Sequence, residues 1–132
     1  MPSYDGESIV LTRCDLIAHR TRFDADLSNT QLRDLRCAIV FVNAFWSAPS
    51  LAALADLADI IHELDPIATL NLIVCDIDLT PPLVDTEWGL QTTAGMGEMA
   101  WVCAGKVVAR HHIAHQCDIR ETTRSLLESR PV

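Results

Sequence analysis

The chain has 132 residues, 49% of them apolar and 21% charged, a balance typical of a soluble globular protein. Its formal net charge of −8 argues against a general nucleic-acid surface, and no apolar run approaches the ~20 residues that a membrane helix needs. The length is that of one domain, which we expect over residues 1–132. The first residues lack the pattern of a secretory signal, so we expect a cytoplasmic protein. From the charge and the lack of a long apolar run, we expect no nucleic-acid or membrane partner.

The first half of the sequence predicts strands and helices in alternation. Ser8–Leu11 is a short β-prone run, and Ser28–Thr30 suits the cap of a short helix over residues 31–36. The apolar run Cys37–Phe45 predicts a central strand covered on both faces. Leu51–Leu64 has apolar residues at a period near 3.6, which predicts a helix with one apolar face.

The second half predicts a further strand, a hairpin and a terminal helix. Leu70–Leu79 is again strongly apolar, and Met99–Val102 and Lys106–Arg110 are predicted to form a hairpin. Asp118 suits the N-cap of a helix from Ile119 to about Ser129. This order of elements is typical of an α/β fold with a central sheet.

The pentapeptide Trp46-Ser47-Ala48-Pro49-Ser50 lies between the first apolar strand and the helix that follows it. It resembles the active-site loop of the thioredoxins, Trp-Cys-Gly-Pro-Cys, with serine at both cysteine positions. Ile77-Asp78 followed by Trp88-Gly89-Leu90 is similar to the family's "D…YGI" region, and Val102–Val108 is similar to its hairpin "FKNGEVV". The resemblance covers roughly Ser8 to Glu128. It implies a thioredoxin-like three-layer α/β fold with a central mixed β-sheet flanked by helices.

The departures from the family imply that its redox chemistry is absent. Thiol–disulfide exchange needs a thiolate nucleophile and a resolving thiol, and serine provides neither. Phe41 stands where the family has a buried proton-managing aspartate, and Ala94–Gly97 lacks the family's cis-proline. We therefore expect no thiol–disulfide oxidoreductase activity, no catalytic residue, no cofactor and no metal.

Candidate reactive side chains also have simpler interpretations. Ser47 could act as a nucleophile only with a base and an orienting acid beside it, so a helix cap with Pro49 in the first turn is the preferred interpretation. His111-His112-x-x-His115 could bind a metal, but no second ligand cluster has recognisable spacing, so a solvated strand end is simpler. Asp76 and Asp78 are likewise interpreted as solvated residues at a strand end.

The five cysteines are odd in number, and none forms a C-x-x-C pair, which indicates neither a zinc ribbon nor a disulfide framework. Cys37, Cys75 and Cys103 adjoin or lie within apolar runs, where a thiol usually behaves as a small hydrophobic group. We therefore interpret these three as core residues.

The resemblance implies a binding surface, because the corresponding region of the family is a groove that receives extended polypeptide. The predicted binding residues are Trp46, Ser47, Ala48, Pro49, Ser50, Met96 and Gly97. The leading hypothesis is a redox-inactive thioredoxin-like protein that serves as a protein-binding, assembly or chaperone factor for a protein or extended peptide. The alternatives are an enzyme of another class on the same fold (a glutathione-dependent transferase or peroxidase-like relative using Ser47 or Cys103) and a homodimeric structural module. A further alternative is that Trp46 packs beneath the turn rather than facing solvent.

Overall fold

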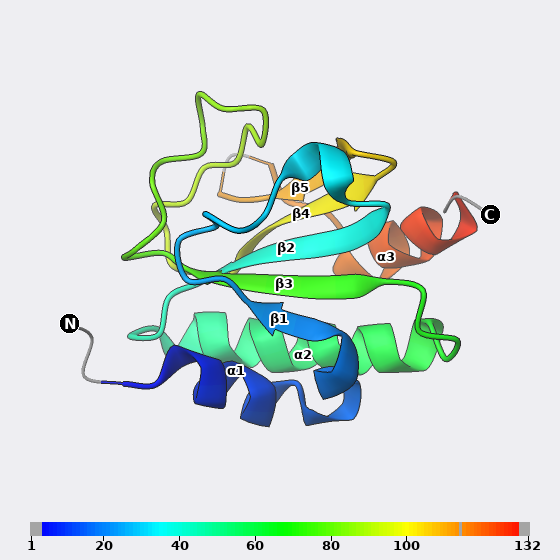
Figure 1. Cartoon of the computed structure of the whole chain (residues 1–132), viewed down its shortest axis with the longest axis horizontal. Helices are drawn as coiled ribbons and strands as arrows, with labels where there is room; N and C mark the ends of the chain where they lie inside the picture. The colour runs from blue at the N-terminus through cyan, green and yellow to red at the C-terminus, as the bar shows by residue number, and fades with distance from the viewer. Residues whose placement is uncertain (1–3, 114, 130–132) are drawn as a thin grey trace.

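The computed structural model describes residues 4–113 and 115–129, and five strands form one mixed sheet at its centre (Figure 1). The strands are β1 (Thr21–Phe23), β2 (Cys37–Asn43), β3 (Asn71–Asp76), β4 (Glu98–Cys103) and β5 (Lys106–His111), in the order β1-β3-β2-β4-β5. β1, β3 and β2 are parallel, whereas β4 is antiparallel to both β2 and β5. Every residue of β2 is buried, as the apolar run predicted for a central strand.

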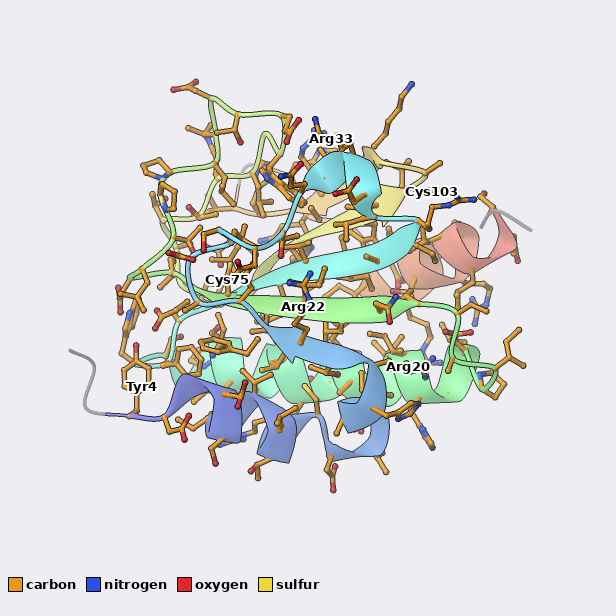
Figure 2. The ribbon with its side chains drawn as sticks, in the orientation of Figure 1. Tyr4, Arg20, Arg22, Arg33, Cys75 and Cys103 are labelled. Atoms are coloured by element: carbon orange, nitrogen blue, oxygen red, sulfur yellow. The ribbon has the colours of Figure 1, made fainter. Side chains whose placement is uncertain are left out.

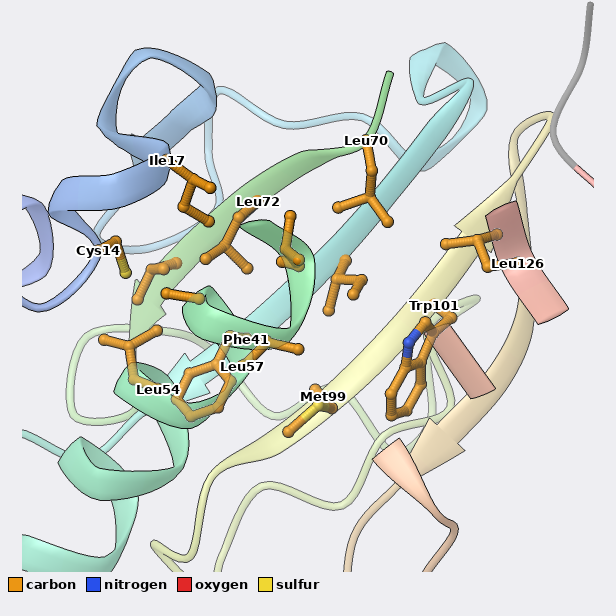
Figure 3. Close-up of a cluster of buried hydrophobic side chains, with 14 of the residues drawn as sticks. Cys14, Ile17, Phe41, Leu54, Leu57, Leu70, Leu72, Met99, Trp101 and Leu126 are labelled. Atoms are coloured by element: carbon orange, nitrogen blue, oxygen red, sulfur yellow. The ribbon is translucent and has the colours of Figure 1, made fainter. Parts of the chain in front are cut away.

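The three α-helices pack on one face of this sheet. They are α1 (Gly6–Arg13), α2 (Ala48–Leu64) and α3 (Ile119–Glu128), and the short 3-10 helix η1 (Asp15–Arg20) follows α1 (Figure 1). Their buried side chains form one core cluster with the sheet (Figure 3), which includes Val10, Ile17, Leu54, Leu57 and Leu126 from the helices and Phe41, Leu72, Met99 and Trp101 from the strands. Burial of this apolar surface is the main force that holds the helices on the sheet.

The other face is covered by the 3-10 helix η2 (Leu32–Asp34) and by residues 77–90. Buried side chains from these two segments pack against that face, namely Leu32, Leu83 and Trp88 against Val40 and Val102. All of segment 77–97 is described, and it consists of turns and irregular chain with one isolated bridge between Leu83 and Leu90. The expected central mixed sheet with flanking helices is therefore confirmed. Within the described residues, the three α-helices lie on one face, and the other face is covered by η2 and irregular chain.

The prediction of a strand at Ser8–Leu11 was wrong, because these residues lie in α1. The Asp5 side chain accepts a hydrogen bond from the backbone N–H of Ser8 at 3.2 Å and thereby caps the helix. Val10 points into the core, and the hydrogen bonds of the first strand are made instead by Thr21–Phe23. The cap outweighs the weak β preference of the run.

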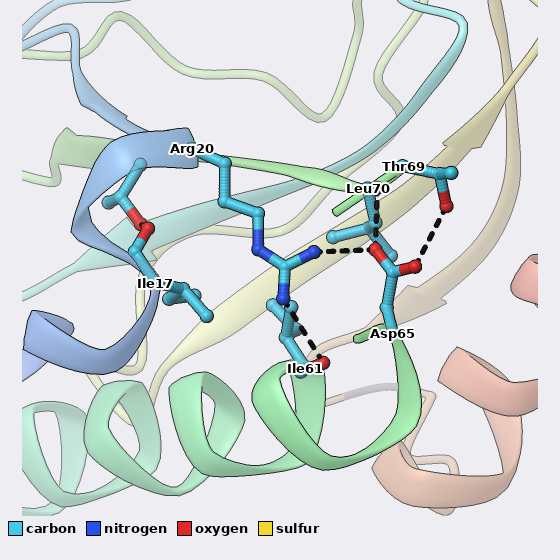
Figure 4. A network of polar contacts seen from close by, with 7 residues as sticks. Ile17, Arg20, Ile61, Asp65, Thr69 and Leu70 are labelled. Carbon is cyan, nitrogen blue, oxygen red and sulfur yellow. Dashed lines mark hydrogen bonds and ion pairs between the residues drawn. The ribbon is translucent and has the colours of Figure 1, made fainter. Parts of the chain in front are cut away.

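A buried ion pair fixes the end of α2, at the position where Asp65-Pro66 interrupts the helix (Figure 4). The Arg20 guanidinium donates to the Asp65 carboxylate at 2.7 Å, and that carboxylate also accepts from Leu70 N at 2.7 Å and Thr69 Oγ1 at 2.9 Å. Removing one partner of such a buried pair typically costs about 3–5 kcal/mol, because the other charge is left uncompensated. The pair therefore anchors the turn that leads into β3.

The remaining elements agree closely with the sequence. The hairpin of β4 and β5 is confirmed, and the Asp118 side chain caps α3 by accepting from Glu121 N at 3.0 Å. The predicted helix over residues 31–36 is the shorter 3-10 turn η2. No helix within the described residues has both the length and the apolar content to cross a membrane.

Candidate functional site

The loop between β2 and α2 places Ser47 at the N-cap of α2, with Pro49 in the first turn. The Ser47 hydroxyl accepts from Ser50 N at 3.3 Å and donates to the carbonyl of Gly95 at 2.6 Å. The capping interpretation of Ser47 is thus confirmed. Because its proton and a lone pair are both engaged, this hydroxyl is held as a structural group.

Ser50 is completely buried and belongs to a second set of internal hydrogen bonds. Its hydroxyl donates to Asn43 Oδ1 at 2.7 Å and accepts from Ala44 N at 3.0 Å. These contacts join the first turn of α2 to the last residue of β2 and to the residue that follows it. Neither serine of the loop presents its hydroxyl to solvent.

The facing turn, residues 94–97, is organised by the buried carboxylate of Glu98 at the start of β4. Glu98 accepts hydrogen bonds of 3.0–3.1 Å from the backbone N–H groups of Ala94, Gly95 and Met96. Gly95 and Gly97 have φ angles of 66° and 91°, in the left-handed region that favours glycine, and the described residues contain no cis peptide bond. The carboxylate and the two glycines therefore build the turn without proline.

Trp46 lies over this turn and faces solvent, with 63% of its surface exposed. A Cβ placed on Gly95 would come within 2.4 Å of the Trp46 ring, so the absence of a side chain at Gly95 is what lets the ring lie there. The indole N–H donates to the Asp78 carboxylate at 3.4 Å. The alternative in which Trp46 packs beneath the turn is not the arrangement found.

The predicted binding residues divide into an exposed group and a supporting group. Trp46, Ala48, Pro49 and Met96 are exposed, and we call these four residues the Trp46 surface. The other three are buried, namely Ser47, Ser50 and Gly97. Gly97 is enclosed, because a Cβ there would lie 2.9 Å from both Phe41 and Ala53, so it cannot admit a partner's main chain.

A cavity of about 430 Å³ adjoins Met96, between the 94–97 turn and the end of β5. Its lining includes Glu98, His111, His112 and Ile113. The Nδ1 atoms of the two histidines accept hydrogen bonds from Cys117 N at 3.1 Å and Gln91 N at 2.9 Å. Burial lowers the pKa of both imidazoles below the ordinary value of 6.5, so neutral rings line the cavity. Within residues 4–113 and 115–129, no cluster of three or more candidate metal ligands occurs.

Asp76 was expected to be solvated, and that interpretation was wrong, because its carboxylate is buried at the end of β3. It accepts hydrogen bonds from Asp78 N and from the hydroxyl of Tyr4, a residue that Figure 2 labels. Burial, followed by the hydrogen bond to Asp76, raises the pKa of Tyr4 to about 12. Tyr4 also stacks on Phe45, one residue before Trp46, with ring centroids 4.8 Å apart. No sequence pattern indicated this contact between the N-terminal segment and the loop.

The core interpretation of the cysteines holds for Cys37 and Cys75 but not fully for Cys103, which is partly exposed. Cys14 is also buried. Burial raises the pKa of Cys14 and Cys75 to about 12, so these two thiols are held protonated near neutral pH.

Comparisons with known proteins give a fold but no family. No family model matches the sequence, and no curated protein is significantly similar to it. One similar structure comes from a study of the thiol resolving mechanism in yeast mitochondrial 1-Cys peroxiredoxin via glutathione and thioredoxin systems, with a TM-score of 0.60 and 14% identity. Another is reduced desulfothioredoxin from Desulfovibrio vulgaris Hildenborough, with a TM-score of 0.54 and 18% identity. Each match covers 83% of this chain and 96% of the other. The chain therefore has a thioredoxin-like α/β fold.

Proposed function

We propose that this thioredoxin-like protein has no thiol–disulfide oxidoreductase activity and binds an extended segment of a partner protein, as an assembly or chaperone factor. The observation that carries the proposal is the exposed indole of Trp46, which stands over a loop whose serine hydroxyls are both bonded internally. Aromatic side chains are frequent anchors of protein interfaces. A loop that keeps its anchor and lacks its thiols fits binding better than redox chemistry.

The chemistry of the loop supports the absence of redox activity. Ser47 and Ser50 stand where the resemblance places the nucleophilic and resolving cysteines, and a hydroxyl cannot form a mixed disulfide. Beneath them, Phe41 is completely buried and packs on Gly97, where the resemblance would place a proton-managing aspartate. The Phe41 side chain has no ionisable group, so this position cannot transfer a proton to or from a thiol.

The way in which a peptide would bind follows from the groups that remain available. The N–H groups of residues 94–96 are bonded to Glu98, and the Gly95 carbonyl is bonded to Ser47. A partner strand cannot pair with these groups, so recognition relies on apolar contact with Trp46 and with Met96, which is 59% exposed. The cavity beside Met96 offers space for one side chain of the partner.

Charge favours a basic partner segment. The protein has a formal net charge of −8, and the exposed carboxylate of Asp78 lies beside the Trp46 indole N–H. Such a field attracts positively charged segments and raises their association rate. We therefore expect the bound segment to combine apolar residues with lysine or arginine.

The test is capture of partners from an extract of the native cells, followed by affinity measurements with the partner recovered. Trp46→Ala is expected to weaken binding by about 1–3 kcal/mol. Ile67→Ala is the matched control, because Ile67 is 66% exposed and lies beyond the opposite end of α2. Circular dichroism checks that both variants fold. Equal affinity of folded Trp46→Ala and the wild type would place the binding site elsewhere.

A further inference from the structure

Cys37 and Cys103 lie directly opposite each other on the two antiparallel strands β2 and β4. Both side chains belong to the core cluster on the helical face, Cys37 as a buried member and Cys103 as a partly buried one. The pair is at the end of the sheet where β2 begins, far along the strand from the Ser47 loop that follows Asn43.

The hydrogen-bond pattern shows which kind of cross-strand pair this is. Cys103 pairs with Lys106 across the two-residue turn Ala104-Gly105, and the backbone bond nearest to Cys37 and Cys103 runs from Ala104 N to Arg36 O at 2.8 Å, one position beyond them. Hydrogen-bonded and non-hydrogen-bonded pairs alternate, which makes Cys37–Cys103 a non-hydrogen-bonded pair with Cα atoms about 4.5 Å apart. Disulfides join residues whose Cα atoms are about 4.4–6.8 Å apart, so this position meets the distance requirement.

The two thiols differ in access to solvent. Cys37 is 5% exposed, whereas Cys103 is partly exposed and lines a surface cavity of about 210 Å³ with Val108, Ser125 and Leu126. The Cys103 thiol, labelled in Figure 2, donates a hydrogen bond to the carbonyl of Ser129, at the end of α3. A small oxidant therefore meets Cys103 first, and Cys37 is in place behind it.

We propose that Cys37 and Cys103 form an oxidisable pair that hydrogen peroxide, or another small hydroperoxide, converts to a cross-strand disulfide. The Cys103 sulfur attacks one peroxide oxygen, the O–O bond breaks, and the departing hydroxide takes the thiol proton as water, which leaves a sulfenic acid. The Cys37 sulfur then attacks the Cys103 sulfur, and the S–O bond breaks as the S–S bond forms. The second hydroxide leaves with the Cys37 proton as water. Two thiols are oxidised and one peroxide is reduced to two waters.

This modification is separate from the binding proposed for the Trp46 surface. It uses the opposite end of β2, and Cys37 is too shielded to exchange with a protein disulfide in repeated cycles. The disulfide would link β2 covalently to β4 and would remove the hydrogen bond from the Cys103 thiol to the end of α3. Either proposal can fail without the other.

Peptide mapping tests the pair on the full-length protein. Combined digestion with trypsin and a glutamate-specific protease places Cys37 in residues 37–63 and Cys103 in residues 99–106, each as the only cysteine of its peptide. After treatment with hydrogen peroxide and alkylation of the remaining thiols, we expect these peptides to be joined, with a mass two hydrogen atoms below their sum. Dithiothreitol is expected to separate them.

Two variants assign the roles of the thiols. Cys37→Ser is expected to leave Cys103 as a sulfenic acid that dimedone traps, and Cys117→Ser, a matched change at another partly exposed cysteine, is expected to keep the linkage. Wild-type protein in which Cys103 is oxidised without a bond to residues 37–63, or in which neither thiol is oxidised, would overturn the proposal. The wild-type map alone decides the question if Cys37→Ser fails to fold.

Discussion

The Ser47 hydroxyl donates a 2.6 Å hydrogen bond to the Gly95 carbonyl and so joins two segments 48 positions apart in the chain. One segment is the start of α2, and the other is the turn that leads into β4. The same hydroxyl caps α2 by accepting from Ser50 N. The Ser47 hydroxyl, a potential nucleophile, therefore has a structural role. The Trp46 ring lies against Gly95 of the same turn.

We predict that the protein gives only the background rate in an insulin-reduction assay with dithiothreitol. Ser47 and Ser50 cannot form a disulfide, and the two partly exposed thiols, Cys103 and Cys117, lie outside this loop. A thioredoxin in the same assay is the positive control. Catalysis above background would contradict the prediction, and its loss in Cys103→Ser would identify the thiol responsible.

Replacement of Ser47 by alanine is expected to lower the free energy of unfolding by about 1–2 kcal/mol, because both the helix cap and the buried bond to Gly95 are lost. Urea denaturation measures the change. Ser125→Ala is the matched control, since Ser125 is an exposed serine within α3 and its replacement is expected to change stability by less than about 0.5 kcal/mol. Equal stability of the two variants would show that the bond between the loop and the turn contributes little.

The elements that the sequence predicted well are those whose signals are local. The all-apolar run of β2, the helical period of α2 and the cap at Asp118 each depend on neighbouring residues. Ser47 was identified as a cap for the same reason, because Pro49 and the following helix are adjacent to it in the chain.

What the sequence could not predict depends on contacts between distant residues. Asp76 looks like the solvated end of a strand, but its carboxylate is buried and accepts a hydrogen bond from Tyr4, 72 positions away. The 94–97 turn needs three backbone N–H groups on the Glu98 carboxylate, and a lone glutamate at the start of a strand gives no sign of that. The opposition of Cys37 and Cys103 depends on the register of β2 and β4, which residue spacing alone cannot give.

The ionisation of Tyr4 is expected to report on its contact with Asp76. Tyr4 is the only tyrosine in the chain, so the ultraviolet absorbance of tyrosinate measures this residue alone. We expect half of the Tyr4 side chains to be ionised near pH 12 in the wild type. The midpoint is expected to be lower in Asp76→Asn, which removes the negative charge of the group that accepts the hydrogen bond from the Tyr4 hydroxyl. Asp78→Asn is the matched control. It is expected to lower the midpoint less than Asp76→Asn does, because the charge of Asp78 contributes least to the raised pKa of Tyr4.

Since the pKa of Tyr4 is raised on folding, its contribution to stability is complete below about pH 10 and is lost as the pH rises through 12. A tyrosinate midpoint near the ordinary value of 10 in the folded wild type would contradict the contact.

Mild acid is expected to destabilise the protein through the two histidines beside the Met96 cavity. The pKa values of His111 and His112 are lowered on folding, mainly by burial, so the unfolded chain binds protons more tightly at these positions. Their contribution to stability is therefore complete above about pH 6.5 and declines as the pH falls through the lowered folded-state values. Protonation of Nδ1 also breaks the bonds from Cys117 N and Gln91 N.

We accordingly expect the urea midpoint of the wild type to be lower at pH 5.5 than at pH 7.5. The variant His111→Asn, whose side-chain oxygen retains an acceptor for Cys117 N but does not titrate, is expected to show a smaller decrease. His62→Asn, an exposed position on α2, serves as the control and is expected to keep the wild-type dependence. The charged groups that act on the two imidazoles are Glu98, Arg110 and His115, and none of them is changed in these variants. A wild-type midpoint that stays constant or rises on acidification would contradict the inferred neutral state of these rings.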